Sequence, residues 1–286
     1  MPERSFLKAS ENFYEERSWG AHGIKPAKDL PTLKLRYLLD LLNSGDIPNA
    51  FLLEIGCGSG RIITSIRERK NNLRLTGLDR SREQLKIAHH ANQAQEVSFI
   101  LGDGEKLPFQ DGTFDYVAIF DFLEHIPNPL HAIREARRVL KRNGYLYAFI
   151  PAEGQPYSIY RISQKLFGIH FKELTCGHIQ KFTIQELEQM LGQHFRIVDR
   201  KFSYHFLGSL MDYLMFVLLL NKRIAKVFWA ENKYYQGGKS KQSIGAHVLN
   251  SLLTFGNAIA FYESTILQNI QWSACGIHLT AVKMPE

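Results

Sequence analysis

The sequence predicts an α/β protein with a doubly wound, parallel β-sheet. Five short apolar runs rich in strand-forming residues occur within residues 50–151, each bounded by Gly, Asp, Asn or Pro. Amphipathic stretches of helical length lie between them. Because alternating strands and helices form right-handed βαβ units, we expect a sheet covered by helices on both faces.

The elements of this fold can be assigned in chain order. The predicted strands are Phe51–Ile55, Leu73–Leu78, Val97–Leu101, Phe114–Phe120 and Gly144–Ile150, with two more at His194–Ser203 and Gly276–Lys283. The predicted helices between and before them are Pro31–Leu42, Arg61–Lys70, Arg82–Asn92 and Pro129–Lys141. A further helix begins at Thr183, where Thr183 and Glu186 have the spacing of a capping box.

The chain divides into three predicted parts. Residues 1–45 form an N-terminal helical segment that covers the cofactor, and residues 46–204 with 272–286 form the sheet domain. Residues 205–271 are an insertion, apolar at both ends and basic in the middle, which we expect to be helical. Its first apolar run is too short to cross a bilayer, so we expect a substrate lid, a membrane-surface element or a dimer contact.

Composition restricts partners and compartment. The formal net charge is +7, but the basic residues are dispersed, so nucleic-acid binding is disfavoured. Three widely spaced cysteines suggest neither a disulfide framework nor a metal-binding CxxC pair. The charged first residues lack the apolar stretch of a secretory signal. We therefore expect a cytoplasmic protein, monomeric or homodimeric, that could associate with a membrane surface.

A glycine-rich turn follows the first predicted strand. The run from Leu52 to Gly60 reads LLEIGCGSG, an apolar strand that ends in Glu54 and passes into a GxGxG turn before a helix. Glycines allow a ligand to approach the backbone without meeting a Cβ atom. The dinucleotide-binding turn would carry another glycine at position 61, which is Arg here, so NAD and FAD are disfavoured.

Polar residues also follow the next strands. Asp79 stands at the end of the second strand, where a carboxylate can accept hydrogen bonds from both hydroxyls of a ribose, and Asp103 follows the third. The fourth strand leads through Phe120 and Asp121 to His125. Ligands of open α/β sheets bind beyond the carboxyl ends of the strands, so these positions should converge on one site.

Four segments together resemble the small-molecule branch of the class I S-adenosylmethionine (SAM)-dependent methyltransferases. They read LLEIGCGSGR, LTGLDRS, ILGDGEKLPFQDGTFDYVAIFDFLEHIPNP and LKRNGYLYAFIP, and the resemblance covers residues 50–151. It implies a seven-stranded, mostly parallel sheet in the order 3-2-1-4-5-7-6 with strand seven antiparallel, which places the insertion between strands six and seven. It also implies SAM as the cofactor.

The resemblance assigns roles to individual residues. Glu54 and the glycine turn would hold the methionine part of SAM, together with Phe120; Asp79 would hold the ribose, and Asp103 with Gly104 the adenine amine. The N-terminal segment would cover the sulfonium with an aromatic ring. The complete set of predicted cofactor residues is Glu54, Gly56, Cys57, Gly58, Gly60, Asp79, Arg80, Asp103, Gly104, Phe120, Tyr14 and Trp19.

The acceptor is less defined by the sequence. The turn after strand four reads Asp121-Phe122-Leu123-Glu124 instead of the [DN]PP[YF] turn of enzymes that methylate base amines. We therefore expect O-, N- or C-methylation of a small, apolar or lipid-like metabolite. The alternatives are a protein or RNA methyltransferase and a non-catalytic SAM-binding protein. His125, His178 and Asp121 are candidate bases, and no metal is expected.

Overall fold

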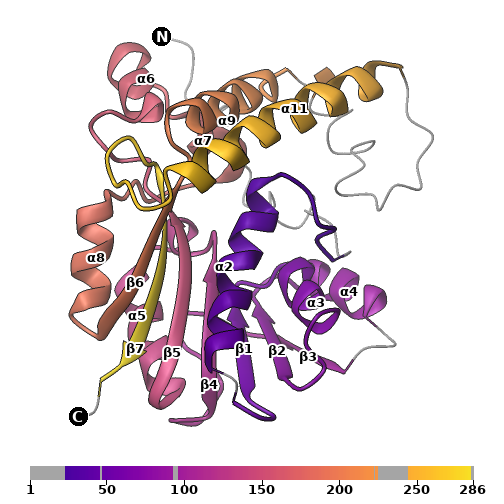
Figure 1. The fold of residues 1–286 in the computed structure, drawn as a ribbon, viewed down its shortest axis with the longest axis vertical. Helices are drawn as coiled ribbons and strands as arrows, with labels where there is room; N and C mark the ends of the chain where they lie inside the picture. The colour runs from indigo at the N-terminus through magenta and orange to yellow at the C-terminus, as the bar shows by residue number, and fades with distance from the viewer. Residues whose placement is uncertain (1–22, 46, 93–95, 222, 225–243, 285–286) are drawn as a thin grey trace.

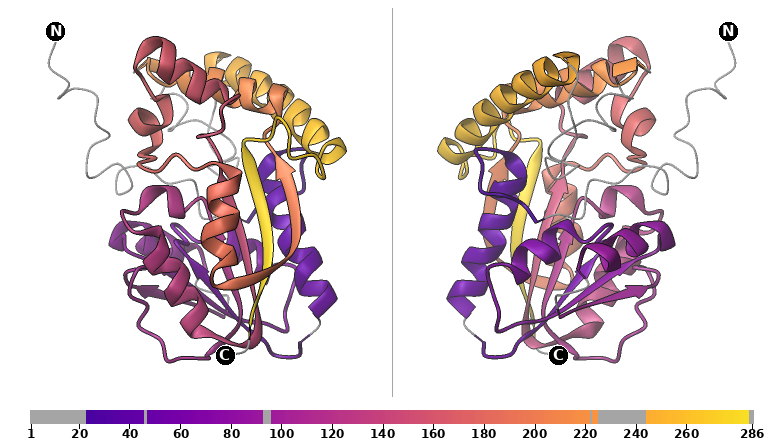
Figure 2. Two further views of the ribbon diagram at one scale, coloured as in Figure 1. Left: turned by 90° about the vertical axis from the view of Figure 1, so that its left-hand side faces the viewer. Right: turned by 90° about the vertical axis from the view of Figure 1, so that its right-hand side faces the viewer.

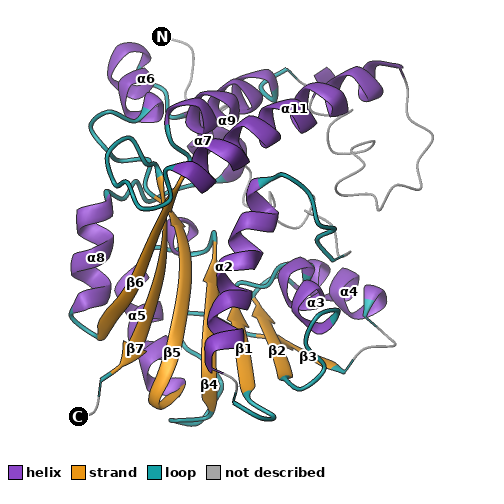
Figure 3. Cartoon of the chain, in the orientation of Figure 1, coloured by secondary structure: helices purple, strands orange, loops and turns teal. Residues whose placement is uncertain are grey.

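The computed structural model describes residues 23–45, 47–92, 96–221, 223–224 and 244–284. Its strands form one seven-stranded sheet in the order β3-β2-β1-β4-β5-β7-β6, which confirms the predicted order (Figure 3). The strands are β1 (Phe51–Ile55), β2 (Arg74–Asp79), β3 (Val97–Leu101), β4 (Phe114–Phe120), β5 (Leu140–Pro151), β6 (Phe195–Ser203) and β7 (Gly276–Lys283). β7 runs antiparallel to both of its neighbours, and the other pairs are parallel.

Most strand limits lie within one residue of the predictions, and β5 is the exception. It begins at Leu140, four residues before the predicted start at Gly144. Leu140 already pairs with Phe114, after which the register shifts and the backbone turns at Asn143 with φ 60°. A local turn inside a strand interrupts the apolar sequence pattern, so a prediction from that pattern begins the strand after the turn.

Helices cover both faces of the sheet, as predicted (Figure 1). One face carries α2 (Leu30–Gly45), α3 (Arg61–Arg67) and α4 (Arg82–Ala91), and the other carries α5 (Pro129–Val139) and α8 (Ile184–Gly192). The capping box of α8 is confirmed. Thr183 accepts a hydrogen bond from the Glu186 backbone, and the Glu186 carboxylate accepts one from the Thr183 N–H.

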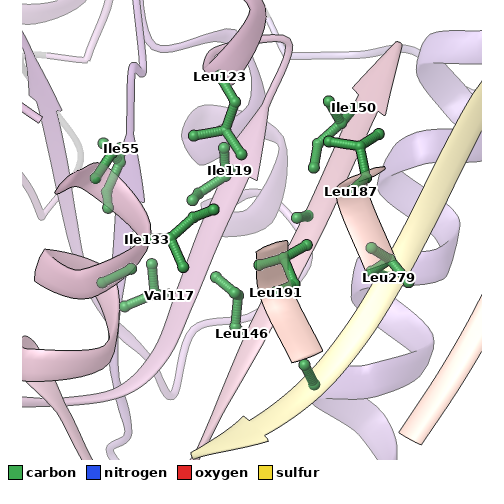
Figure 4. Packing of buried hydrophobic residues seen from close by; sticks show 14 of the residues in the cluster. Ile55, Val117, Ile119, Leu123, Ile133, Leu146, Ile150, Leu187, Leu191 and Leu279 are labelled. Atoms are coloured by element: carbon green, nitrogen blue, oxygen red, sulfur yellow. The ribbon is translucent and has the colours of Figure 1, made fainter. Parts of the chain in front are cut away.

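The strands divide the core in two because successive side chains point to opposite faces. Leu53, Ile55, Val117 and Ile119 pack under α5 and α8, and Figure 4 shows this cluster. The intervening residues of the same strands pack under α2, α3 and α4. Burial on both faces explains why β1 and β4 appear in the sequence as continuous apolar runs.

A helical cap covers the carboxyl ends of the parallel strands (Figure 2). It contains α6 (Ile159–Phe167), α7 (Phe171–Cys176), α9 (Phe206–Leu218) and α11 (Ile244–Ile266). The last two lie between β6 and β7 in sequence and pack against each other, so the described parts of the predicted insertion contain two helices, as expected. No helix among the described residues is long and apolar enough to cross a membrane.

Candidate active site

The glycine turn leaves β1 directly beside the end of β2. The N–H groups of Gly56 and Cys57 both donate to the carbonyl of Leu78, at 2.8 and 3.0 Å. Gly56 has φ +75°, and a Cβ there would lie 2.6 Å from the Phe122 ring. Gly58 also has a positive φ, but a Cβ there would meet nothing within 4 Å. The turn therefore presents bare backbone to open space at Gly58, as close approach of a ligand requires.

Glu54 lies at the end of β1, beneath this turn. Its side chain is buried, and Oε2 has no hydrogen-bond partner among the described residues. Burial raises the pKa of Glu54 well above its ordinary value, against the opposing effect of the Ile63 backbone N–H. A buried carboxylate oxygen without a donor is costly, and a ligand that donates a hydrogen bond would remove this cost. The residue therefore fits the amino end of SAM.

Asp79 and Asp103 occupy the ends of the next two strands. The Asp79 carboxylate accepts hydrogen bonds from the backbone N–H groups of Gly58 at 2.7 Å and Ser81 at 2.8 Å, which fix its orientation. Ser81, and not Asp79, caps α4. Asp103 is exposed, and its Oδ1 accepts from the Glu105 N–H. Both carboxylates therefore lie at the edge where the sequence places the ribose and the adenine.

The other predicted cofactor residues differ in how their side chains point. Gly104 is buried, and a Cβ there would lie 2.5 Å from the Phe122 ring. Phe120 packs its ring against Tyr147 in the core beneath α2, and Cys57 is buried beside Gly77. Arg80 is exposed. Phe122, which the sequence did not single out, thus contacts both the glycine turn and the loop after β3.

The structure brings two of the three candidate bases together. The rings of His125 and His178 meet edge to face, with centroids 4.7 Å apart. His125 Nδ1 lies 3.2 Å from the Gly177 carbonyl, and His178 Nδ1 lies 3.0 Å from a Glu153 carboxylate oxygen. Burial lowers the pKa of His125 to about 3. This imidazole is therefore neutral at physiological pH.

The third candidate base, Asp121, pairs with a lysine of α2. Its backbone has a left-handed φ of 45°, and its two carboxylate oxygens accept hydrogen bonds from the Lys34 ammonium of α2, at 2.6 and 2.9 Å. Lys34 itself is buried and lies over the Phe149 ring, 3.7 Å from its centroid. The pair ties the end of β4 to the N-terminal helix.

A buried ionic network under the cap was not predicted. The Glu153 carboxylate lies 2.9 Å from Lys172 Nζ, which also lies 2.8 Å from Asp212, and Asp212 accepts a hydrogen bond from the Tyr160 hydroxyl. Burial alone would raise the pKa of Glu153, but His178 and Lys172 hold it below its ordinary value. Glu153, Lys172, Asp212 and Tyr160 line a cavity of about 20 Å³, room for about one water molecule.

Asp79 and Asp103 were singled out because each is an acid that follows a predicted strand, and the same criterion applies to Glu153. Glu153 stands two residues after Pro151, the last residue of β5, so it too is an acid at a strand end. Its partners carry no such signal because Lys172 and Asp212 lie on helices of the cap, far from it in sequence. The other two predicted residues, Tyr14 and Trp19, lie outside the described residues.

A larger cleft of about 600 Å³ lies away from these residues. It is bordered by α2 residues such as Arg36 and Asp40, and by mid-strand residues of β5 and β7 such as Tyr145 and Thr280. Among the described residues, none that the sequence assigns to the cofactor or to catalysis lines it. The cleft opens on the α2 face of the sheet, so it is separate from the strand ends that carry the cofactor constellation.

Comparisons with known proteins agree with this geometry. Residues 53–148 match the family described as "Methyltransferase domain". The chain is 31% identical over 121 residues to a demethylmenaquinone methyltransferase from Thermotoga maritima, covering 42% of this chain and 51% of the relative. It is 31% identical over 135 residues to a ubiquinone biosynthesis O-methyltransferase from Vibrio campbellii, covering 46% and 56%. The chain thus spans about half the length of these curated relatives.

A solved structure supports the fold over a longer stretch. A protein described as a methyltransferase from Bacillus halodurans superposes with a TM-score of 0.56 at 19% identity, over 88% of this chain and 99% of that one. The sheet order is that of the methyltransferase fold. Residues 53–148 thus form a methyltransferase domain of the class I SAM-dependent type, and SAM is the cofactor of that family.

Proposed function

We propose that the protein transfers a methyl group from SAM to a small metabolite, by O-, N- or C-methylation. One observation carries this proposal. Glu54, the open backbone at Gly58 and the fixed carboxylate of Asp79 lie together at the carboxyl edge of the sheet, and the buried Oε2 of Glu54 has no partner within the described part of the chain. When bound, SAM supplies an electrophilic methyl group on a sulfonium, and the acceptor supplies the electron pair.

The residues around this edge support such a transfer mainly by position. In-line displacement depends on aligning the acceptor and excluding water, which the cap over the strand ends can provide. If the acceptor must lose a proton, His178 is the better placed of the candidate bases. Its Nδ1 faces the Glu153 carboxylate, which leaves Nε2 to accept the proton. Asp121 is already paired with Lys34.

An apolar or lipid-like acceptor is the class we favour. The names of the two relatives concern quinone compounds, and quinones of this kind are apolar. The cap of this chain exposes large apolar side chains on α9, on α11 and on the segment after it, including Phe206, Leu252, Phe255, Ile266 and Trp272. We propose that the insertion serves as a substrate lid, and that a membrane surface or a second copy of the chain are the alternative partners of these side chains.

The proposal is tested by following labelled methyl groups. The purified protein is incubated with methyl-labelled SAM and a cell lysate, which is then separated into organic-soluble, protein and RNA fractions. We expect label in the organic fraction, and we expect the Asp79→Ala variant to lose it. Label in protein or RNA would instead support the alternative acceptor classes, and SAM binding without any label would support the non-catalytic alternative.

A further inference from the structure

The connection between β3 and β4, residues 102–113, carries the residues assigned to the adenine. This connecting segment is described throughout and forms no helix, although a helix usually joins two parallel strands. An irregular segment cannot satisfy its own backbone groups, so other parts of the chain must supply hydrogen-bond partners. Asp103 and Gly104 stand near its start. The contacts that fix the course of the segment therefore also fix where these two residues lie.

Arg138, in the last turn of α5, binds the second half of the connecting segment. Its guanidinium donates to the carbonyls of Leu107 and Phe109 at 3.0 and 2.7 Å, to Asp111 at 2.7 Å, and twice to Glu135 at 2.7 and 2.8 Å. A guanidinium has five N–H groups in one rigid plane, so every donor of Arg138 is used. A lysine ammonium has three donors and cannot reproduce this set. Arg138 therefore fixes three points of the segment relative to α5.

Glu135, three residues earlier on α5, completes the contact. Its Oε2 accepts a hydrogen bond from the Leu107 N–H at 2.7 Å as well as one from Arg138. The hydrogen bonds from Arg138 lower the pKa of Glu135 below its ordinary value, so the carboxylate stays ionised. The pair thus binds both the N–H and the carbonyl of Leu107, whose side chain is buried in the core under α5. The backbone is therefore fixed three residues after Gly104.

The first half of the connecting segment is attached to the other end of α5. Asp103 Oδ1 accepts a hydrogen bond from the Glu105 N–H at 2.9 Å, and Glu105 Oε1 accepts one from the Asn128 N–H at 2.8 Å. Asn128 is the N-cap residue of α5, the helix that also carries Glu135 and Arg138. The segment therefore lies along α5 and is attached to it at both ends, with Asp103 one hydrogen bond away from the first attachment.

We propose that Glu135 and Arg138 are positioning residues for recognition of the adenine amine of SAM. They act through the connecting segment, which they hold along α5 so that Asp103 and Gly104 are in place before the cofactor binds. A group that is already ordered pays no ordering cost on binding, and its hydrogen bond keeps good geometry. The proposal rests on the placement of the adenine at Asp103, and it extends the cofactor site to two residues of α5.

The test compares two ligands that differ at the position of the adenine amine. S-adenosylhomocysteine, the demethylated form of SAM, keeps the amine, whereas S-inosylhomocysteine carries a carbonyl oxygen there and cannot donate to Asp103. Both dissociation constants are measured by calorimetry for the wild type, Arg138→Lys and Glu135→Gln. We expect the wild type to prefer S-adenosylhomocysteine by about tenfold or more, as a hydrogen bond to a charged acceptor provides. Each variant should reduce this preference by about threefold or more, because a displaced carboxylate forms a poorer hydrogen bond.

The ratio of the two dissociation constants separates positioning from stability. A variant that is partly unfolded loses affinity for both ligands equally, so its ratio stays at the wild-type value. The matched control is Arg134→Lys, at an exposed arginine of the same helix, which should keep the wild-type ratio. A wild-type ratio in Arg138→Lys or in Glu135→Gln, or a wild type that binds both ligands equally, would overturn the positioning role and leave the proposed function standing. The proposed function itself would fail only if the folded wild type did not bind SAM.

Discussion

At the scale of single residues, the site is built around buried carboxylates whose partners are backbone groups or are missing. Asp79 is satisfied by two backbone N–H groups, whereas Glu54 Oε2 has no hydrogen-bond partner among the residues that the structure describes. An unsatisfied buried acid lowers the stability of the free protein, and it is retained when a ligand uses it. Glu54 should therefore contribute more to SAM binding than to folding.

The Glu54→Gln variant tests whether Glu54 contributes more to SAM binding than to folding. The amide keeps the shape but removes the negative charge, so a charge-assisted hydrogen bond worth about 1.5–3 kcal/mol is lost. We expect the dissociation constant for SAM to rise about 10- to 150-fold, while the free energy of unfolding without SAM stays the same or rises. The control is Glu68→Gln, at a half-exposed acid paired with Arg69. An unchanged affinity for SAM would show that Glu54 does not contact the cofactor.

The buried histidines make stability depend on pH. Burial lowers the pKa of His125 to about 3, below the ordinary value of 6.5 that it regains on unfolding. Between these values the unfolded chain binds the extra proton, so stability falls as the pH drops below 6.5. The cost at pH 5 is about 2 kcal/mol. Urea unfolding at pH 7 and pH 5 should show a smaller difference for His125→Gln than for the wild type, and equal differences would refute this origin.

The residues of the cofactor constellation were predictable, but those of the ionic network were only partly so. Glu54, Asp79 and Asp103 lie at or just beyond the ends of predicted strands, so topology alone predicted that they would lie at one edge. Glu153 follows a strand in the same way and could have been found. Lys34 contacts Asp121 from α2, and Lys172 contacts Glu153 from the cap. The partners are far apart in the sequence, so no local sequence pattern predicts these pairs.

At the scale of elements, the cap is held together by polar groups that satisfy helix ends. The N-cap residue of α9, His205, makes no side-chain capping hydrogen bond. Instead, the Glu263 carboxylate of α11 accepts from the N–H groups of Leu207 and Gly208, at 2.8 and 2.6 Å. A carboxylate from one helix thus satisfies the first turn of another and complements its dipole.

Removing this carboxylate should loosen α9. We expect Glu263→Ala to destabilise the protein by about 1–3 kcal/mol and to speed hydrogen exchange of the first α9 amides, because two backbone donors of the first turn lose a charged acceptor. Glu263→Gln should restore part of the loss. The control is Glu83→Ala, which removes an exposed pair with Lys86 and should change stability by less than about 0.5 kcal/mol. Equal effects at positions 83 and 263 would contradict the capping role.

Elements with a local signal were predicted well, and those that depend on tertiary contacts were not. The α8 start followed from Thr183 and Glu186, which satisfy each other within one turn. The start of β5 at Leu140 depends on pairing with Phe114 and was missed. The insertion was predicted to be helical from its apolar composition, but its anchoring through Asp212 and Glu263 required the fold.

At the scale of the whole molecule, the topology explains why the site lies where it does. The strand order 3-2-1-4-5-7-6 brings the carboxyl ends of β1, β2, β3 and β4 to one edge, and the helical cap lies over that edge. Binding of SAM and approach of an acceptor would then take place at the same edge of the sheet. This arrangement of strand ends indicates the class of the protein, whereas we expect the cap to determine which acceptor molecule binds.

The most direct test of the central claim is a calorimetric titration of the purified protein with SAM, compared with NAD. We predict one SAM bound per chain, an affinity reduced in both Glu54→Gln and Asp79→Ala, and no heat from NAD, since Arg61 replaces the glycine of a dinucleotide-binding turn. A folded protein that binds NAD, or that does not bind SAM at all, would contradict the assignment of the site.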